Sequence, residues 1–208
     1  MKNVWPLLFL IAACATTPVP QAPVEAAPVP PPRVSSSAVP GAEQFAALEA
    51  QLLEADPFIL RFHIESKGAI TALAKGDVIR IHDSFSLHAY GKAGGEDKEG
   101  DLKLEHAPEA TRRTVILGMT RMGLLHNIYR LYSKQDVDAD IDRRVEAGNV
   151  MWDPVARKFT FDIMVQGAKT AEVELWVNEA NRPVQRHVVV HFPQGDMNVR
   201  ESYVWPHS

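Results

Sequence analysis

Residues 158–177 read KFTFDIMVQGAKTAEVELWV, and this stretch decides the fold. Its first half alternates apolar and polar side chains, with Phe159 and Phe161 on the apolar side. Its second half repeats the alternation after a turn at Gly167. A period of two residues is typical of a β-strand with one buried face. The stretch therefore predicts two antiparallel strands joined by a short turn.

The same alternation recurs on both sides of this pair of strands. Further strands are expected at residues 58–65, 69–73, 77–82, 84–90, 149–152, 184–192 and 199–205, and another is expected to start at Leu102. Residues 91–101 are rich in glycine and charge and are expected to form a flexible connection. Successive strands with short turns and no helix between them predict an antiparallel meander.

Two helical segments accompany the strands. Phe45, Leu48 and Leu52 recur at helical spacing within residues 43–55, and the run ends at Asp56 because the next residue is a proline. Residues 109–134 form the second segment. A sheet this large must twist and curl. We therefore expect an α+β fold: a large curled antiparallel sheet, or half-open barrel, with the N-terminal helix and the mid-chain helical segment packed in its concavity.

The mid-chain segment carries more apolar surface than a helix needs to pack on one face of a sheet. Its apolar residues extend well beyond the ~100° arc with which a surface helix packs on a sheet. Arg121 falls inside this arc and needs a partner. Gly118 and Gly123 weaken the helix and could divide it in two.

Three explanations of the surplus remain open. The segment is deeply buried, or it covers an apolar cavity in which Met119 and Met122 adapt to a ligand, or it lies on a bilayer with a basic edge toward the headgroups. For the cavity, the expected lining residues are Val115, Met119, Met122, Leu125 and Tyr129 of the segment, with Phe85, Leu87 and Phe161 of the sheet.

Residues 136–142 contain four aspartates and superficially resemble a calcium-binding loop. An EF-hand loop needs glycine at its sixth position and glutamate at its twelfth. Counted from Asp136, these positions hold Ile141 and Ala147. The sequence therefore predicts a solvated acidic loop and no metal site here.

Signals for catalysis are weak throughout the sequence. It has no Gly-x-Ser-x-Gly stretch and no glycine-rich phosphate loop. His187 and His191 have a spacing that would bind metal on a helix, but four residues of a strand span about 13 Å. His63, His82 and His88 fall on predicted solvent-side positions. We predict a protein that is not an enzyme and needs no cofactor or metal.

The N-terminus carries a targeting signal. Lys2 precedes an apolar run of about ten residues, which is too short to span a bilayer and is typical of a signal peptide. Ile11-Ala12-Ala13-Cys14 resembles the bacterial lipobox, and Cys14 is the sole cysteine. The resemblance implies cleavage before Cys14 and attachment of acyl chains such as palmitate, so that the protein is a lipoprotein held at the membrane. Several acyl chains would anchor it permanently.

These signals divide the 208 residues into three parts. Residues 1–13 are the expected signal peptide, residues 14–41 the lipidated cysteine and a Pro/Ala-rich tether, and residues 42–208 a single domain. The tether cannot bury enough apolar surface to fold, and its prolines favour extended polyproline II. A formal net charge of −4 gives no reason to expect a nucleic acid partner.

The order of the elements resembles that of the LolA/LolB family, the periplasmic lipoprotein carrier and the outer-membrane lipoprotein receptor. The most specific part is Val-Glu-Leu-Trp-Val-Asn at 173–178, continuing through Asn-Arg-Pro-Val-Gln-Arg at 181–186. The resemblance implies an apolar cavity between sheet and helices that takes up acyl chains. Because this chain carries its own anchor, it is closer to the receptor. Ala15 follows the cysteine in place of the aspartate associated with inner-membrane retention, so we expect the outer membrane, with the domain facing the periplasm.

Three functions follow as hypotheses. The first is a membrane-anchored lipoprotein that binds acyl chains or other lipoproteins in an apolar cavity. The second is a scaffold lipoprotein that binds another cell-envelope protein. The third is a hydrolase that uses exposed histidines and carboxylates.

Overall fold

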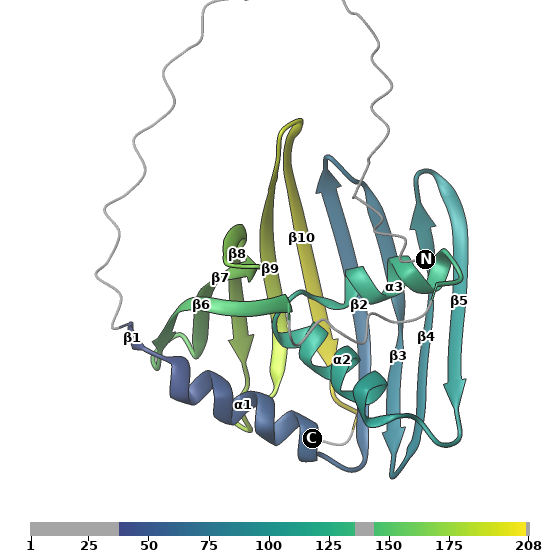
Figure 1. Cartoon of the computed structure of the whole chain (residues 1–208), viewed down its shortest axis with the longest axis horizontal. Helices are drawn as coiled ribbons and strands as arrows, with labels where there is room; N and C mark the ends of the chain where they lie inside the picture. Colours follow the sequence, from purple (N-terminus) through teal and green to yellow (C-terminus); the bar gives the residue numbers. More distant parts are fainter. Residues whose placement is uncertain (1–37, 136–143, 207–208) are drawn as a thin grey trace, which may run out of the picture. The chain divides into compact units, whose positions relative to one another are not determined.

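Alternating burial along the strands builds one large antiparallel sheet (Figure 1). This is a computed structural model, and it describes residues 38–135 and 144–206, all within the compact unit Ser35–Ser208. Cys14, the signal peptide and the acidic stretch 136–142 lie outside the described residues. None of the helices in the described ranges is long and apolar enough to cross a membrane.

Ten strands belong to the sheet in the described parts of the chain, in the order β1-β6-β7-β8-β9-β10-β2-β3-β4-β5. They form two meanders, β2 to β5 and β6 to β10, which join where the last strand pairs with the first long one. The strands are β1 Val39–Pro40, β2 Phe58–Gly68, β3 Ala72–Ile81, β4 Ser84–Ala93, β5 Glu96–Leu104, β6 Val145–Asp153, β7 Lys158–Val165, β8 Ala168–Val177, β9 Pro183–Phe192 and β10 Gly195–Val204.

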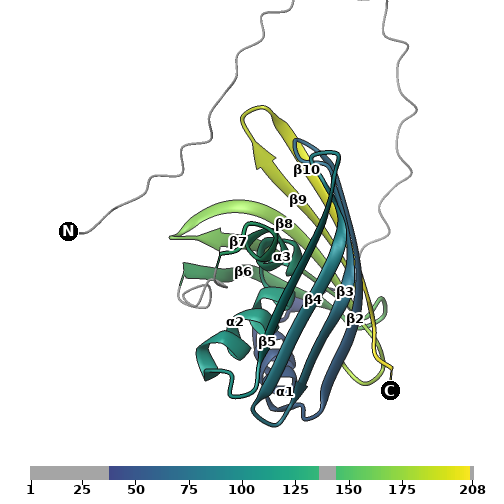
Figure 2. The same cartoon turned by 90° about the vertical axis from the view of Figure 1, so that its right-hand side faces the viewer.

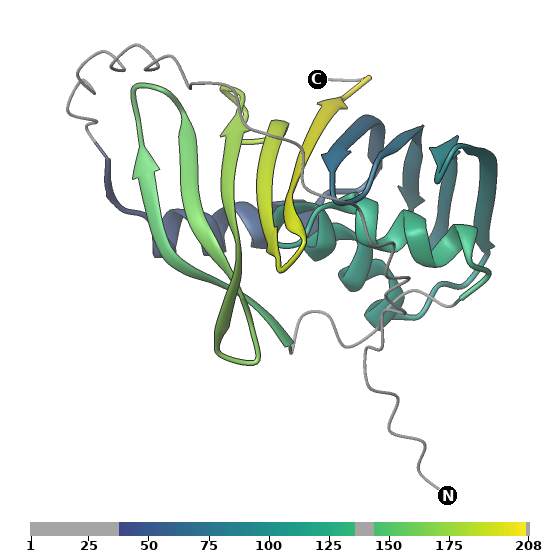
Figure 3. The same cartoon turned by 90° about the horizontal axis from the view of Figure 1, so that it is seen from above.

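The sheet curls around the helices, which lie on its concave face (Figures 2 and 3). Helix α1 (Ala42–Glu54) lies over the half formed by β6 to β9. Helices α2 (Glu109–Thr120) and α3 (Leu124–Tyr132) lie over the half formed by β10 and β2 to β5. The predicted α+β fold, with a curled sheet around helices, is confirmed.

The core fills the space between the helices and the inner face of the sheet. Phe45 of α1 packs against two aromatic rings of β7, and its ring centroid lies 5.5 Å from that of Phe159 and 4.9 Å from that of Phe161. Both phenylalanines point inward because they share one face of β7. The stretch quoted first thus supplies the surface on which the N-terminal helix packs.

The expected flexible connection at residues 91–101 is wrong. Strand β4 continues to Ala93, a turn forms at Gly94 and Gly95 with positive φ angles, and β5 runs from Glu96 to Leu104. Leu102 therefore lies near the end of a strand that was expected to start there. The strand was missed because its residues are mostly charged or glycine, and this composition is possible because β5 is the edge of the sheet. An edge strand tolerates charged residues, which discourage pairing with another chain.

Other boundaries differ from the expected ones. The two strands expected at 69–73 and 77–82 are a single strand, β3, which passes through Gly76. A Cβ at Gly76 would lie 1.9 Å from the carbonyl oxygen of His88, so the neighbouring strand approaches too closely for a side chain. At the other edge, Val39 and Pro40 of the expected tether pair with Trp152 and Met151 of β6.

Candidate functional site

The mid-chain segment is two helices joined at residues 121–123, which we call the helix joint; α2, the joint and α3 together form the helical cover. Gly123 divides the segment, with a φ of 89° and a ψ of 159° that only glycine adopts readily. In α2, residues 114–120 are all buried. In α3 only Leu124, Asn127 and Ile128 are buried. Deep burial therefore accounts for the apolar surplus of α2 but not for that of α3.

The structure brings most of the expected lining residues together. Five of them are buried in one apolar cluster: Phe85, Leu87, Val115, Met119 and Phe161. Met122 and Leu125 are partly buried and pack against this cluster. Tyr129 is 43% exposed and lies at its surface. The lining set is thus a contiguous interior that reaches solvent along α3.

Arg121 in the helix joint has a carboxylate partner in α1. Its Nε and Nη2 donate to Oε1 and Oε2 of Glu49, each at 2.8 Å, and its Nη1 donates to the carbonyl oxygen of Val145 at 3.0 Å. Thr120 also donates to Oε1 of Glu49 at 2.8 Å. Glu49 is only 8% exposed, so this two-point pair holds the joint to α1 with little screening by solvent.

Two buried side chains of opposite charge meet the joint from the sheet. Arg186 of β9 and Glu201 of β10 stand directly opposite each other, both buried on the inner face. Glu201 accepts hydrogen bonds from the backbone N–H groups of Leu124 at 3.2 Å and Leu125 at 3.3 Å. The first N–H groups of a helix lack partners within it and carry its positive dipole end, so a carboxylate stabilises them.

Arg186 contacts the opposite side of the joint. Its Nη2 donates to the carbonyl oxygen of Arg121, which ends α2. Burial lowers the pKa of Arg186, and the charge of Glu201 opposes that shift. An arginine guanidinium is protonated in proteins, so Arg186 is a cation. Tyr203 donates its hydroxyl to Glu201, and burial raises the pKa of this phenol well above its usual value. The sheet therefore binds the end of α2 through a cation and the start of α3 through an anion.

No space remains between the joint and these charges. A Cβ at Gly123 would lie 2.3 Å from Nη1 of Arg186 and 2.6 Å from Oε1 of Glu201. Glycine is required at this position both by its backbone angles and by the close approach of the two side chains.

The sequence analysis gave no role to Glu49 or Glu201, and it named Arg186 only as the last residue of the motif at 181–186. A signal for Arg186 and Glu201 is present, because each occupies an inward position in a strand whose inward residues are otherwise mostly apolar. A charge in the apolar register of a strand predicts a buried ion or a site. Glu49 gave no such signal, because one glutamate in an amphipathic helix is usually solvated.

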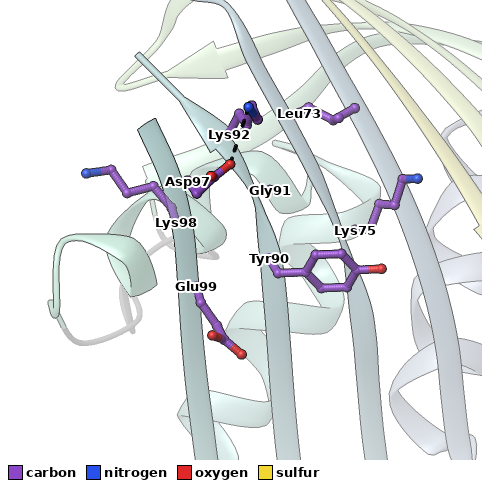
Figure 4. A pocket seen from close by; sticks show the side chains of 8 residues that line it. All are labelled: Leu73, Lys75, Tyr90, Gly91, Lys92, Asp97, Lys98 and Glu99. Carbon is purple, nitrogen blue, oxygen red and sulfur yellow. Dashed lines mark ion pairs between the residues drawn. The ribbon is translucent and has the colours of Figure 1, made fainter. Parts of the chain in front are cut away.

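The outer face of the sheet carries polar features. A hollow of about 490 Å³ lies over β3 to β5, lined by Leu73, Lys75, Tyr90, Gly91, Lys92, Asp97, Lys98 and Glu99 (Figure 4). The side chains of Tyr90, Lys92 and Asp97 stand on the side of the strands away from the helices, and Lys92 pairs with Asp97 at 3.5 Å. This hollow is therefore separate from the interior beneath the helical cover.

Histidines occupy the surface as well. His63 and His82 are exposed, and His82 hydrogen-bonds to Asp56 at 3.0 Å. His88 is half-buried, hydrogen-bonds to Asp101 at 2.8 Å and lies near Glu99 on the outer face. His82 and His88 thus have carboxylate neighbours on the surface and not in a closed pocket.

A scan against protein-family models and a search of curated proteins each find no match to this chain.

Proposed function

We propose that this protein is a membrane-anchored, periplasm-facing lipoprotein that binds acyl chains or lipoproteins beneath its helical cover. The observation that carries the proposal is the half-buried helix α3 above an apolar interior. Its residues Leu125, Leu131 and Tyr132 are partly buried, and Tyr129 is exposed. An acyl chain that entered beneath α3 would replace contacts that are already incomplete.

Helix α3 is too short to be stable by itself. It has nine residues, and isolated helices of this length are marginal in water. The backbone turn at Gly123 lets it move without breaking α2. Its position depends on the hydrogen bonds of its first turn to Glu201 and on apolar contacts with the edge of the sheet.

Beneath α3 the inner face of the sheet is lined by small residues. Three neighbouring strands contribute these small residues, which are Ala74, Gly76, Ala89 and Gly100. Longer side chains at these positions would fill the concavity. Leu131 of α3 rests directly on the edge strand, because a Cβ at Gly100 would lie 2.7 Å from its Cγ. Displacement of α3 would expose a shallow apolar trough of the kind that suits an unbranched acyl chain.

A reversible disulfide tests the proposal. Cysteines at Gly100 and Leu131 are close enough for a bridge, which would hold α3 against β5. We expect the wild-type chain to bind a fluorescent fatty acid, the oxidised Gly100→Cys/Leu131→Cys variant to lose this binding, and reduction to restore it. The reduced variant is the matched control, since it has the same sequence.

Two outcomes would contradict the proposal. If the wild-type protein binds no fatty acid, it has no acyl-binding compartment. Oxidised variant that binds as well as the reduced one would show that ligands do not enter beneath α3.

The scaffold function has one specific observation in its favour. Tyr90 is 51% exposed and Leu73 37% exposed, side by side with lysines around the outer hollow (Figure 4). Exposed aromatic and apolar side chains of this kind are enriched at protein interfaces. Crosslinking in cells through a photoreactive residue at position 90 would capture a stoichiometric envelope protein if this function is correct, and capture of none would count against it.

A further inference from the structure

Asn127 of α3 is a buried amide whose hydrogen bonds are not made. It is 0% exposed, and neither Nδ2 nor Oδ1 finds a hydrogen-bond partner among the described residues. Thr114 of α2 is 1% exposed, and its Oγ1 also lacks a partner in these parts of the chain. Native proteins pair the large majority of such atoms, so an amide with both ends unpaired calls for a reason.

These atoms lie along the contact between α2 and α3. A Cβ at Gly118 would come within 2.8 Å of Nδ2 of Asn127 and 4.0 Å of the carbonyl oxygen of Gly123. Thr114 precedes Gly118 by four residues and therefore lies on the same face of α2. The unpaired amide thus sits where the two helices of the cover separate if α3 moves about the joint.

An apolar residue would suit this position better in the closed structure. Leucine has a similar size and leaves no unpaired polar atom, and the neighbours Leu124 and Ile128 are buried and apolar. The polar side chain is therefore placed for a state in which something else lies between the helices. The proposed function supplies that state, because an acyl lipid would enter there.

We propose that Asn127 recognises the polar linkage of the bound acyl lipid and selects an amide linkage over an ester. This inference rests on the proposed function. A carboxamide presents one acceptor and one N–H donor, which match the N–H and the carbonyl of a secondary amide. An ester carries acceptors only and would leave Oδ1 of Asn127 unpaired. The ligand class is thus an acyl chain joined through nitrogen, and Thr114 offers a further hydroxyl one helical turn from Gly118 on the same face of α2.

The test is displacement of a fluorescent fatty acid from the full chain by two competitors of equal length, N-methylhexadecanamide and methyl hexadecanoate. We expect wild-type protein to prefer the amide by about tenfold or more, the factor that one unpaired buried acceptor produces. Asn127→Leu is expected to weaken binding of the amide until the two competitors have equal affinity, and to raise the melting temperature. Asn198→Leu, at an exposed position on β10, is the control. It should leave the preference for the amide unchanged and should not raise the melting temperature.

Each remaining outcome overturns the inference. A lower melting temperature of Asn127→Leu would mean that the amide stabilises the closed structure. Equal affinity of both competitors for wild-type protein, or a preference for the amide that persists in Asn127→Leu, would show that Asn127 does not select the linkage. If wild-type protein binds the fluorescent fatty acid but shows no preference, only this inference fails, whereas no binding at all removes the proposed function itself.

Discussion

Substitution of Gly123 by alanine tests whether the two buried charges really hold the helix joint. The residue has a φ of 89° and a ψ of 159°, a region that is almost exclusive to glycine. An added Cβ would also meet Nη1 of Arg186 at 2.3 Å and Oε1 of Glu201 at 2.6 Å. Both side chains are buried and surrounded, so neither has free space to move into.

The expected loss of stability has two parts. A non-glycine residue in such a backbone region costs about 1–3 kcal/mol. Forcing a methyl group into a packed interior costs about 1–3 kcal/mol more. Gly167→Ala is the matched control, because Gly167 also has a positive φ, 79°, but no described atom lies within 4 Å of its added Cβ. The control should show the backbone part alone.

Equilibrium urea denaturation of the two variants and the wild type measures both parts. Gly123→Ala should lower the free energy of unfolding by about 1–3 kcal/mol more than Gly167→Ala does, with an unchanged denaturant slope. If Gly123→Ala costs no more than the control, the contact of the joint with Arg186 and Glu201 does not stabilise the fold, and our account of the joint is wrong.

Three further predictions concern the remaining charges and the anchor. Glu49→Ala removes three hydrogen bonds that Arg121 and Thr120 donate to the Glu49 carboxylate, and should lower the free energy of unfolding by about 3 kcal/mol in urea denaturation, whereas a loss below about 1 kcal/mol would show that these bonds do not hold the joint to α1. A hydrogen bond from Lys169 lowers the pKa of Asp162, so the stability it contributes is complete above the unfolded pKa and is lost as pH falls through the lower folded pKa. Asp162→Asn should therefore weaken the loss of stability below about pH 4, and an unchanged acid transition would refute this. Cys14→Ser should move the chain from the membrane fraction to the soluble fraction of cells, and retention in the membrane would contradict lipidation.

The sequence was sufficient to predict most of the elements. Period-two alternation located β7, β8 and β9 because each has one face against the core and one toward solvent. Helix α1 was predicted with its end correct to one residue, because proline after Asp56 excludes a further helical turn. These are local consequences of side-chain chemistry and need no knowledge of neighbours.

Prediction failed where a residue's surroundings departed from that local pattern. Strand β5 has few apolar residues because it is an edge strand that pairs with β4 on one side only. Its Gly100 makes room for Leu131, which comes from a helix thirty residues later. Nothing within residues 91–101 records that contact.

The candidate site shows the same division. The sequence by itself determined most of the strands, the two helical regions, the apolar surplus of the second region and the need of Arg121 for a partner. Only the tertiary structure decided that the partner is Glu49, and that Arg186 and Glu201 meet the ends of α2 and α3. The physical reason is that a charge can be buried only where distant parts of the chain bring its counter-charge and hydrogen-bond partners to it, and that meeting depends on strand register and helix packing.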